Sequence, residues 1–163
     1  MSPPGSTILD LGCNDGRIAR HLLASGVAGR VFAIDREDLI ADKPPNLTFL
    51  LADVEHLDLR TFQRVDVVLA LNILHHLVAR SRELARETIR AARDMSTSVI
   101  VDMGSFTERG PWEWRQSYER FWSDDDEMFA YLFESAPRRS LLQYPAMAGG
   151  HRVLWHIEGR HRE

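Results

Sequence analysis

Residues 8–22 read ILDLGCNDGRIARHL: an apolar run, a polar turn and the amphipathic start of a helix. A strand that delivers a glycine-rich turn to a helix N-terminus points backbone N–H groups at a ligand. The dinucleotide-binding form of this turn reads G-x-G-x-x-G, whereas here Gly12 and Gly16 stand four residues apart and Asp10 precedes them. A carboxylate at this place would repel a pyrophosphate. It suits the cationic head group of an amino acid instead.

Short apolar runs alternate with helical patterns along the chain, which predicts an α/β domain. The run VDVVLAL at 65–71 is typical of a strand buried on both faces of a sheet. Right-handed crossovers between such strands give a doubly wound, Rossmann-like sheet that is mostly parallel. The Gly149-Gly150 turn region predicts an antiparallel strand pair near the C-terminus. The expected strands are 6–11, 30–35, 47–53, 65–71, 98–104, 140–147 and 151–159, and the expected helices include 17–26 and 80–95.

The composition indicates one globular domain. The chain has 163 residues, of which 44% are hydrophobic, which is enough to bury a core. Its formal net charge of -4 disfavours binding to long nucleic acids, which requires a basic surface. The single cysteine, Cys13, cannot form an internal disulfide, and no stretch approaches the roughly 18 apolar residues of a membrane span. These observations predict a cytoplasmic protein without a membrane segment.

Ligands of doubly wound sheets bind outside the carboxyl ends of the strands, so the residues at those ends are candidate site residues. Asp35 ends the second expected strand, Asp53 ends the third, and Asn72 follows the fourth. Together with the turn at 10–16, they make the chain resemble class I S-adenosylmethionine-dependent methyltransferases, whose first motif reads acidic-x-Gly-x-Gly-x-Gly. Asn14 stands at the middle glycine of that motif. Asparagine tolerates the left-handed backbone conformation, so the turn is expected to persist.

The resemblance covers roughly residues 6–104 and implies a cofactor with a set of contacts. It implies that Asp35 binds both ribose hydroxyls, which require a bidentate acceptor. It places Asp53 and the backbone of Val54 beside the adenine ring, and Asn72 beside the methionine ammonium. The cofactor implied is S-adenosylmethionine, with S-adenosylhomocysteine as product and no metal. The implied cofactor-binding residues are Asp10, Gly12, Cys13, Asn14, Gly16, Asp35, Arg36, Asp53, Val54 and Asn72.

Three side chains near the expected methyl position are candidate catalytic residues. His75 and His76 follow the fourth strand, and a neutral histidine is a suitable base for a hydroxyl or amine acceptor. Asp102 lies near the end of the fifth strand. Each also has a structural interpretation: adjacent histidines on a turn point in different directions, and Asp102 suits a cap or a buried hydrogen-bonded carboxylate. An anionic acceptor would need no base.

The segment 105–137 is rich in aromatic residues and lies between the expected core at 6–104 and the strand pair at 138–159. The simpler interpretation is a helix packed on the edge of the sheet, and the alternative is a lid that lines the acceptor pocket. Arginines in and after this segment suit bidentate recognition of a phosphate or carboxylate. The candidate substrate residues are Trp112, Trp114, Arg115, Tyr118 and Arg152.

A basic stripe follows one face of the expected helix 80–95, beside a separate apolar stripe. Charged helix faces usually lie in solvent, so these side chains are expected to be solvated. The members of the stripe are Arg82, Arg86, Arg90 and Arg93.

The sequence therefore predicts a single methyltransferase domain over residues 1–163. Its expected reaction is O-methylation of a small polar or anionic acceptor, such as a sugar, a natural product or a terminal phosphate. The last of these comes from a loose similarity, in the run from Gly150 to His156, to methyltransferases that cap a terminal phosphate on RNA or polysaccharide. A non-catalytic module that binds S-adenosylmethionine is the alternative. A nicotinamide-dependent enzyme is disfavoured by Asp10 and the spacing of the glycines.

Overall fold

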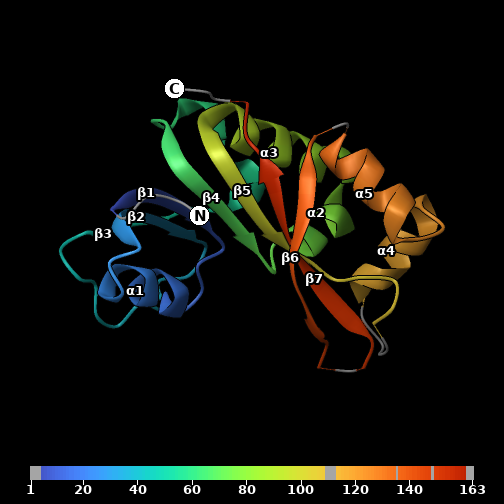
Figure 1. The fold of residues 1–163 in the computed structure, drawn as a ribbon, viewed down its shortest axis with the longest axis horizontal. Helices are drawn as coiled ribbons and strands as arrows, with labels where there is room; N and C mark the ends of the chain where they lie inside the picture. The colour runs from blue at the N-terminus through green and yellow to red at the C-terminus, as the bar shows by residue number, and fades with distance from the viewer. Residues whose placement is uncertain (1–4, 109–112, 135, 148, 161–163) are drawn as a thin grey trace.

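The computed structural model describes residues 5–108, 113–134, 136–147 and 149–160. The strands within them are β1 (Ser6–Leu11), β2 (Ala28–Asp35), β3 (Leu47–Leu51), β4 (Val65–Leu71), β5 (Ser96–Asp102), β6 (Arg138–Pro145) and β7 (His151–Glu158). These described strands form one seven-stranded sheet in the order β3-β2-β1-β4-β5-β7-β6 (Figure 1). Strands β1 to β5 pair in parallel, and β7 pairs antiparallel with β5 and β6. The expected doubly wound sheet with an antiparallel C-terminal pair is confirmed.

Helices cover the two faces of the sheet unequally. Helix α1 packs with the apolar side chains of one face, over β1 and β2, and the other helices pack with the opposite face. Figure 1 shows α1 separated by the sheet from the group α2 to α5. All described helices are too short or too polar to cross a membrane. Their bounds are α1 (Arg17–Ala24), α2 (Leu74–Arg80), α3 (Arg82–Met95), α4 (Glu113–Phe121) and α5 (Asp125–Phe133), with short 3-10 helices η1 (Val54–His56) and η2 (Leu59–Thr61).

Two parts of the chain contain more helix than the sequence predicted. Residues 74–80 form α2, because Leu74, Leu77 and Val78 recur at helical spacing and are all buried. The aromatic segment forms two helices, since Asp124 accepts a hydrogen bond from the Glu127 N–H at 2.9 Å and thereby caps the start of α5. The segment is thus a pair of helices that pack on the sheet.

The expectation that the basic stripe of α3 is solvated is wrong for Arg93, whereas Arg82, Arg86 and Arg90 are half exposed. Arg93 is buried, and its Nε donates to the carbonyl oxygen of Glu158 at 3.1 Å. The guanidinium groups of Arg82 and Arg86 lie over the ring of Tyr131, 5.1 and 4.8 Å from its centre. Residues from α5 and the end of β7 cover this face of α3, so the arginines serve as packing and hydrogen-bonding groups.

The aromatic side chains of α4 belong to the core. Trp114 and Tyr118 are buried and lie ring against ring, with their centroids 4.9 Å apart. Gly104, just after β5, lies directly beneath Trp114, because a Cβ at Gly104 would lie 2.3 Å from the indole Cη2. The close approach of α4 to the sheet therefore depends on the missing side chain at position 104.

Gly104→Ala is expected to lower the free energy of unfolding by about 1–3 kcal/mol, since the new methyl group forces the indole of Trp114 out of its place. Urea unfolding followed by tryptophan fluorescence measures the change. Combining the substitution with Trp114→Leu removes the clash. The double variant should therefore lose less stability than the sum of the losses of the two single variants. An alanine variant as stable as the parent would show that α4 does not pack this closely.

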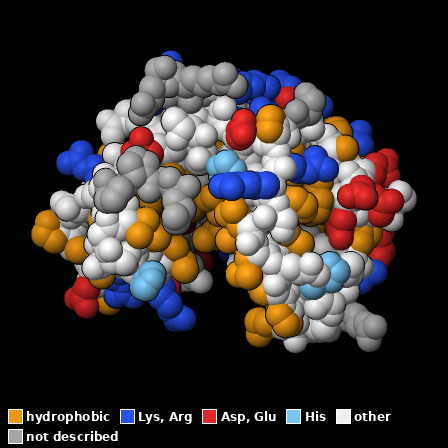
Figure 2. Space-filling view, in the orientation of Figure 1, with side chains coloured by type: hydrophobic (Ala, Val, Ile, Leu, Met, Phe, Trp, Pro, Cys, Tyr) orange, Lys and Arg blue, Asp and Glu red, His pale blue; other side chains and the backbone are white. Residues whose placement is uncertain are grey.

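Strand β6 is one of the two edges of the sheet, and β3 is the other. All of its residues except Tyr144 are exposed, and its register with β7 shifts between Ser140 and Leu142. The exposed side chains include Leu141 and Leu142. Figure 2 shows the molecule hollowed between the β6–β7 hairpin and the part that carries α1, with hydrophobic side chains along that hollow. The face of β5, β7 and β6 opposite α2 to α5 is therefore free of a covering helix within the described residues.

Candidate active site

The turn after β1 alternates left-handed residues with ordinary ones. Gly12, Asn14 and Gly16 have φ values of 71°, 50° and 68°, which confirms the conformation expected for Asn14. The Gly12 N–H donates to the carbonyl oxygen of Ile34 at 2.9 Å, and the Asn14 N–H donates to Oδ2 of Asp35 at 2.7 Å. The turn is thus tied to the end of the neighbouring strand β2.

The two glycines of this turn are also required by their surroundings. A Cβ at Gly12 would lie 3.0 Å from Cδ1 of Ile73, and a Cβ at Gly16 would lie 2.7 Å from Cδ1 of Ile40. Side chains at these positions would strain the left-handed backbone and fill the cradle that the turn forms. The open cradle is what a close backbone approach to a ligand requires.

A cavity of about 630 Å³ opens at the carboxyl ends of the strands, a size typical of sites for small ligands. It lies at the switch point between β1 and β4, where the strand order reverses. Leu77 in α2, Ile73 just before α2 and Leu39 in the loop after β2 also line the cavity. The sequence singled out none of them, and it did not predict α2. The predicted residues that line the cavity are Gly12, Asn14, Asp35, Arg36, Asp53, Val54, Asn72 and His76.

Asp10, Cys13 and Gly16 do not line the cavity; Asp10 and Cys13 are buried beside the turn. Oδ2 of Asp10 has no hydrogen-bond partner among the described residues. Burial, and to a lesser degree the charge of Asp35, raises the pKa of Asp10 to about 7. Burial also raises the pKa of the Cys13 thiol to about 12, so the thiol is protonated. An unpaired buried carboxylate needs a cation or donor nearby, and an ammonium group in the cavity would fit that need.

The raised pKa of Asp10 has a consequence for stability. The ordinary value is 3.8, so between about pH 4 and 7 the folded protein keeps a proton that the unfolded chain has lost. The Asp10 contribution to stability is therefore lost as the pH rises through this range. Asp10→Asn is expected to remove this loss. Without ligand, the variant should melt at a higher temperature than the parent at pH 8, and the difference in melting temperature should be smaller at pH 5. Melting curves that differ by the same amount at both pH values would contradict the assignment.

The two candidate histidines differ in place and in basicity. His75 is buried, and its ring lies 4.2 Å from that of His76 and 5.5 Å from that of Trp114. Burial, followed by the charges of His76 and Arg152, lowers the pKa of His75 to about 3. His76 is exposed and lines the cavity, and its pKa is lowered mainly by desolvation. A base with a pKa near 3 holds a proton weakly at neutral pH, so His75 is poorly matched to proton removal.

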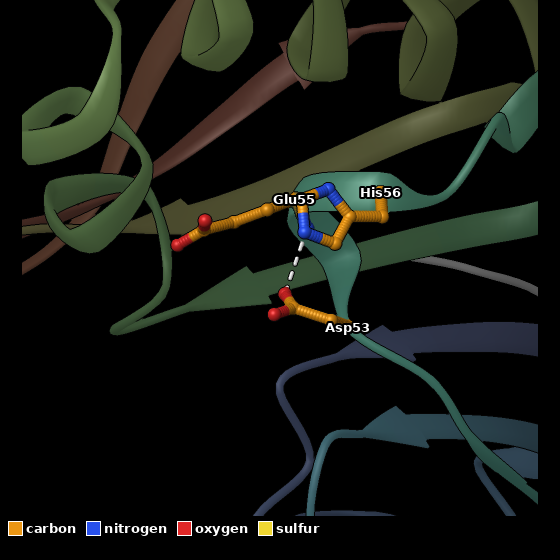
Figure 3. Close-up of side chains that lie close together, drawn as sticks. All are labelled: Asp53, Glu55 and His56. Carbon is orange, nitrogen blue, oxygen red and sulfur yellow. Dashed lines mark hydrogen bonds between the residues drawn. The ribbon is translucent and has the colours of Figure 1, made fainter.

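Asp53 lies with Glu55 and His56 at the start of η1 (Figure 3). Single ligand atoms of these three side chains lie within 4.8 Å of one another. The carboxylates already have partners, because Asp53 accepts from the Glu55 N–H at 2.9 Å and Glu55 pairs with Arg80 at 3.4 Å. Asp53 thus acts as the cap of η1 and stands on the cavity wall at the same time.

The predicted substrate arginines converge on Glu108, a residue that the sequence did not single out. Arg152 donates through Nε and Nη2 to the two carboxylate oxygens of Glu108, at 2.7 and 3.0 Å. Nη1 of Arg115 donates to the backbone carbonyl oxygen of Glu108. Nη1 of Arg152 donates to Oδ1 of Asn72, which joins this ion pair to the cavity. No local motif marks Glu108, since its partner stands 44 residues further along the chain.

Asp102, Trp114 and Tyr118, three other candidates from the C-terminal half, are all buried. Asp102 is buried at the end of β5, and its Oδ2 accepts a hydrogen bond from Oη of Tyr144 at 2.5 Å. Tyr118 is 0% exposed and Trp114 is buried, so the structure places both in the core rather than on a pocket wall. Trp112 lies outside the described residues.

Comparison with known proteins identifies the family. Residues 9–100 match the sequence profile of a family described as "Methyltransferase domain", and the match covers more than half of the 163 residues. The chain belongs to the class I methyltransferase family. Use of S-adenosylmethionine is implied by membership of this family. The comparison with curated protein sequences gives no match.

Solved structures of methyltransferases share this fold. The bifunctional kinase-methyltransferase WbdD superposes with a TM-score of 0.77 at 20% identity, over 94% of this chain and 34% of the WbdD chain. The N-terminal domain of EvdMO1, in the presence of SAH and D-fucose, gives a TM-score of 0.67 at 20% identity, over 96% of this chain and 77% of that domain. The chain thus spans about a third of the WbdD chain. At these identities the likeness concerns the fold.

Proposed function

We propose that the chain transfers a methyl group from S-adenosylmethionine to an oxygen of a small polar or anionic acceptor. The observation that carries the proposal is the cavity at the switch point, which collects Gly12, Asn14, Asp35, Asp53 and Asn72 from separate parts of the sequence. Family membership supports the donor, and the residues present fit it. The proposed acceptors are a sugar, a natural product and a terminal phosphate.

Each part of the donor has a matching group in the cavity. Asp35 offers two carboxylate oxygens for the ribose hydroxyls. Asp53 and Val54 also line the cavity, and we assign them to the adenine ring. Asn72 on the cavity wall offers an oxygen to the methionine ammonium. Asp10 is buried beside the turn and does not line the cavity, so it would act on that ammonium through its charge. An ammonium beside Asp10 would favour its charged form and thereby remove the cost of an uncompensated buried carboxylate.

When bound, S-adenosylmethionine supplies a methyl carbon activated by the adjacent positive sulfur, so the hard part of the chemistry belongs to the donor. The protein then has to align the acceptor oxygen and keep water away. Alignment alone lowers a reaction barrier by about 7–11 kcal/mol in favourable cases. Leu77 in α2 and Ile73 just before it give the cavity an apolar wall that serves the exclusion of water. The presence of SAH and D-fucose with EvdMO1 supports a sugar hydroxyl within the proposed range of acceptors.

Two measurements test the proposal. Calorimetry with S-adenosylhomocysteine is expected to show binding at one site per chain. Incubation with S-adenosylmethionine labelled in its methyl group is expected to yield labelled product from a panel of sugars, phenols and phosphate monoesters. Absence of S-adenosylhomocysteine binding would refute the proposal. Tight binding without label transfer to any acceptor would favour the alternative of a non-catalytic binding module.

A further inference from the structure

A polar cluster adjoins the cavity on the side of Asn72. This Arg152 cluster consists of Asp102, Glu108, Tyr144 and Arg152. Arg152 donates to the side-chain oxygen of Asn72, and the Asn72 N–H donates to the carbonyl oxygen of Asp102 at 2.8 Å. Because Asn72 also lines the cavity, the cluster stands next to the place proposed for the methionine end of the donor.

The charge of Arg152 is already neutralised by Glu108. The two side chains form a bidentate ion pair, and they are only 16% and 2% exposed. An anionic acceptor would compete with Glu108 for the guanidinium and would leave a buried carboxylate without its partner. Breaking a buried pair in this way is strongly unfavourable.

The remaining charge of the cluster also opposes an anion. Asp102 adds a second carboxylate, so the cluster holds two acidic groups and one guanidinium. The neighbouring Arg115 is paired with Glu119 at 2.8 Å. Like charges placed side by side in a poorly solvated site repel strongly. A phosphate or carboxylate acceptor would therefore enter a site that is neutral to negative. A neutral group that donates a hydrogen bond would meet no such penalty.

Tyr144 and Asp102 offer a path for a proton. Oη of Tyr144 donates to Oδ2 of Asp102 at 2.5 Å, and Tyr144 is partly exposed whereas Asp102 is buried. Oδ1 of Asp102 has no hydrogen-bond partner in the described part of the chain. Burial raises the pKa of Asp102, which makes it a better proton acceptor than an exposed aspartate.

We propose that the acceptor is a neutral hydroxyl group rather than a phosphate or a carboxylate, and that Tyr144 contacts this hydroxyl while Asp102 receives its proton. The inference rests on the proposed function and narrows it to one class of acceptor. Tyr144 is then a catalytic residue. Asp102 and Glu108 are positioning residues, because the first acts through Tyr144 and the second holds Arg152 against Asn72.

The acceptor oxygen forms a bond to the methyl carbon, and the carbon–sulfur bond breaks with its electron pair left on sulfur. The hydroxyl proton passes to Oη of Tyr144 as the phenolic proton of Tyr144 passes to Asp102. The products are the methyl ether, S-adenosylhomocysteine and a protonated Asp102, which later loses its proton to water.

Binding of inorganic phosphate tests the acceptor class without turnover. Calorimetry on the full chain loaded with S-adenosylhomocysteine is expected to show no saturable phosphate binding. Glu108→Gln releases Arg152 and is expected to gain phosphate affinity by roughly tenfold or more. The control Glu87→Gln alters a carboxylate that pairs with Arg60 and Arg90, neither of which contacts the cluster, and should bind no phosphate. Saturable wild-type binding that Arg152→Gln abolishes would overturn the proposal, as would a folded Glu108→Gln protein with no gain.

Tyr144→Phe tests the proton path. With neutral methyl glycosides as acceptors, kcat is expected to fall on the order of 100-fold, with little change in the acceptor KM or in affinity for S-adenosylhomocysteine. Asp102→Asn should have a similar effect, which Asp102→Glu partly restores. The control is Tyr131→Phe, since Oη of Tyr131 donates to Glu83 at 3.2 Å and neither residue belongs to the cluster.

The outcomes separate the two proposals. If S-adenosylhomocysteine does not bind, the proposed function is wrong. If it binds but sugar phosphates are methylated on the phosphate, or if Tyr144→Phe keeps the parental kcat, the donor assignment stands and the hydroxyl inference is wrong.

Discussion

Replacing Asp35 with alanine is expected to weaken the binding of S-adenosylhomocysteine by about 100-fold. The Asp35 carboxylate lies on the cavity wall at the end of β2, where it can accept from two ribose hydroxyls. Two hydrogen bonds to a charged group contribute about 3 kcal/mol or more together. Asp35 also accepts from the Asn14 N–H at 2.7 Å, so its loss loosens the turn that carries Gly12.

Isothermal titration calorimetry measures this effect. The control is Asp38→Ala, because Asp38 pairs with Lys43 at 2.8 Å and does not line the cavity. Asp35→Asn separates the two roles of the side chain, since an amide still accepts from the Asn14 N–H but carries no charge. A folded Asp35→Ala protein with the parental affinity would show that Asp35 does not hold the ribose.

Arg152→Met is expected to lower the free energy of unfolding by about 3–5 kcal/mol, because it leaves the carboxylate of Glu108 buried without its partner. Glu108 keeps one short-range contact, from the Ser105 N–H at 3.0 Å, which cannot balance a full charge. The same substitution removes the donor to the Asn72 side chain. The stability of the C-terminal strand pair and the shape of the cavity are therefore coupled through one guanidinium.

Urea unfolding of the single and double variants checks this expectation. Glu108→Leu combined with Arg152→Met removes both charges, so the double variant should be more stable than Arg152→Met alone. The exposed pair Arg17–Asp15, at 3.0 Å, provides the comparison, and Arg17→Met should change stability by less than about 1 kcal/mol. If Arg152→Met costs no more than Arg17→Met, the ion pair is not buried in solution.

The wall of the cavity that carries Gly12, Asn14 and Asp35 could be predicted from the sequence because its signals are local. The turn carries its own spacing of Gly12, Asn14 and Gly16, and Asp35 and Asp53 each follow an apolar run that reads as a strand. Parallel strands bring their carboxyl ends to one edge. The order of the motifs along the chain therefore placed them around one cavity.

The Arg152 cluster could not be predicted in the same way. Glu108 meets Arg152 across 44 residues, and Asp102 meets Tyr144 across 42, so no window of sequence contains either pair. Arg152 was singled out for its residue type, but its partner decides what it does. The short helix α2 was missed because its seven residues follow a strand directly and lack a capping side chain.

The arginines of α3 show why a charged stripe can mislead. Arg93 is buried by the end of β7, and the half-exposed Arg82 and Arg86 place their guanidinium groups over the ring of Tyr131 from α5. Both covering elements come late in the chain. A helix face looks solvated in sequence when the residues that pack on it lie 40 or more positions away.

The open edge of β6 bears on how the protein behaves when it is concentrated. An unpaired strand is a template on which another chain can add, and this one carries exposed Leu141 and Leu142 at its middle. Arg138 and Arg139 at its start, Pro145 at its end and the register shift between Ser140 and Leu142 all hinder such addition. The sheet can therefore leave Tyr144 within reach of solvent without becoming a seed for aggregation.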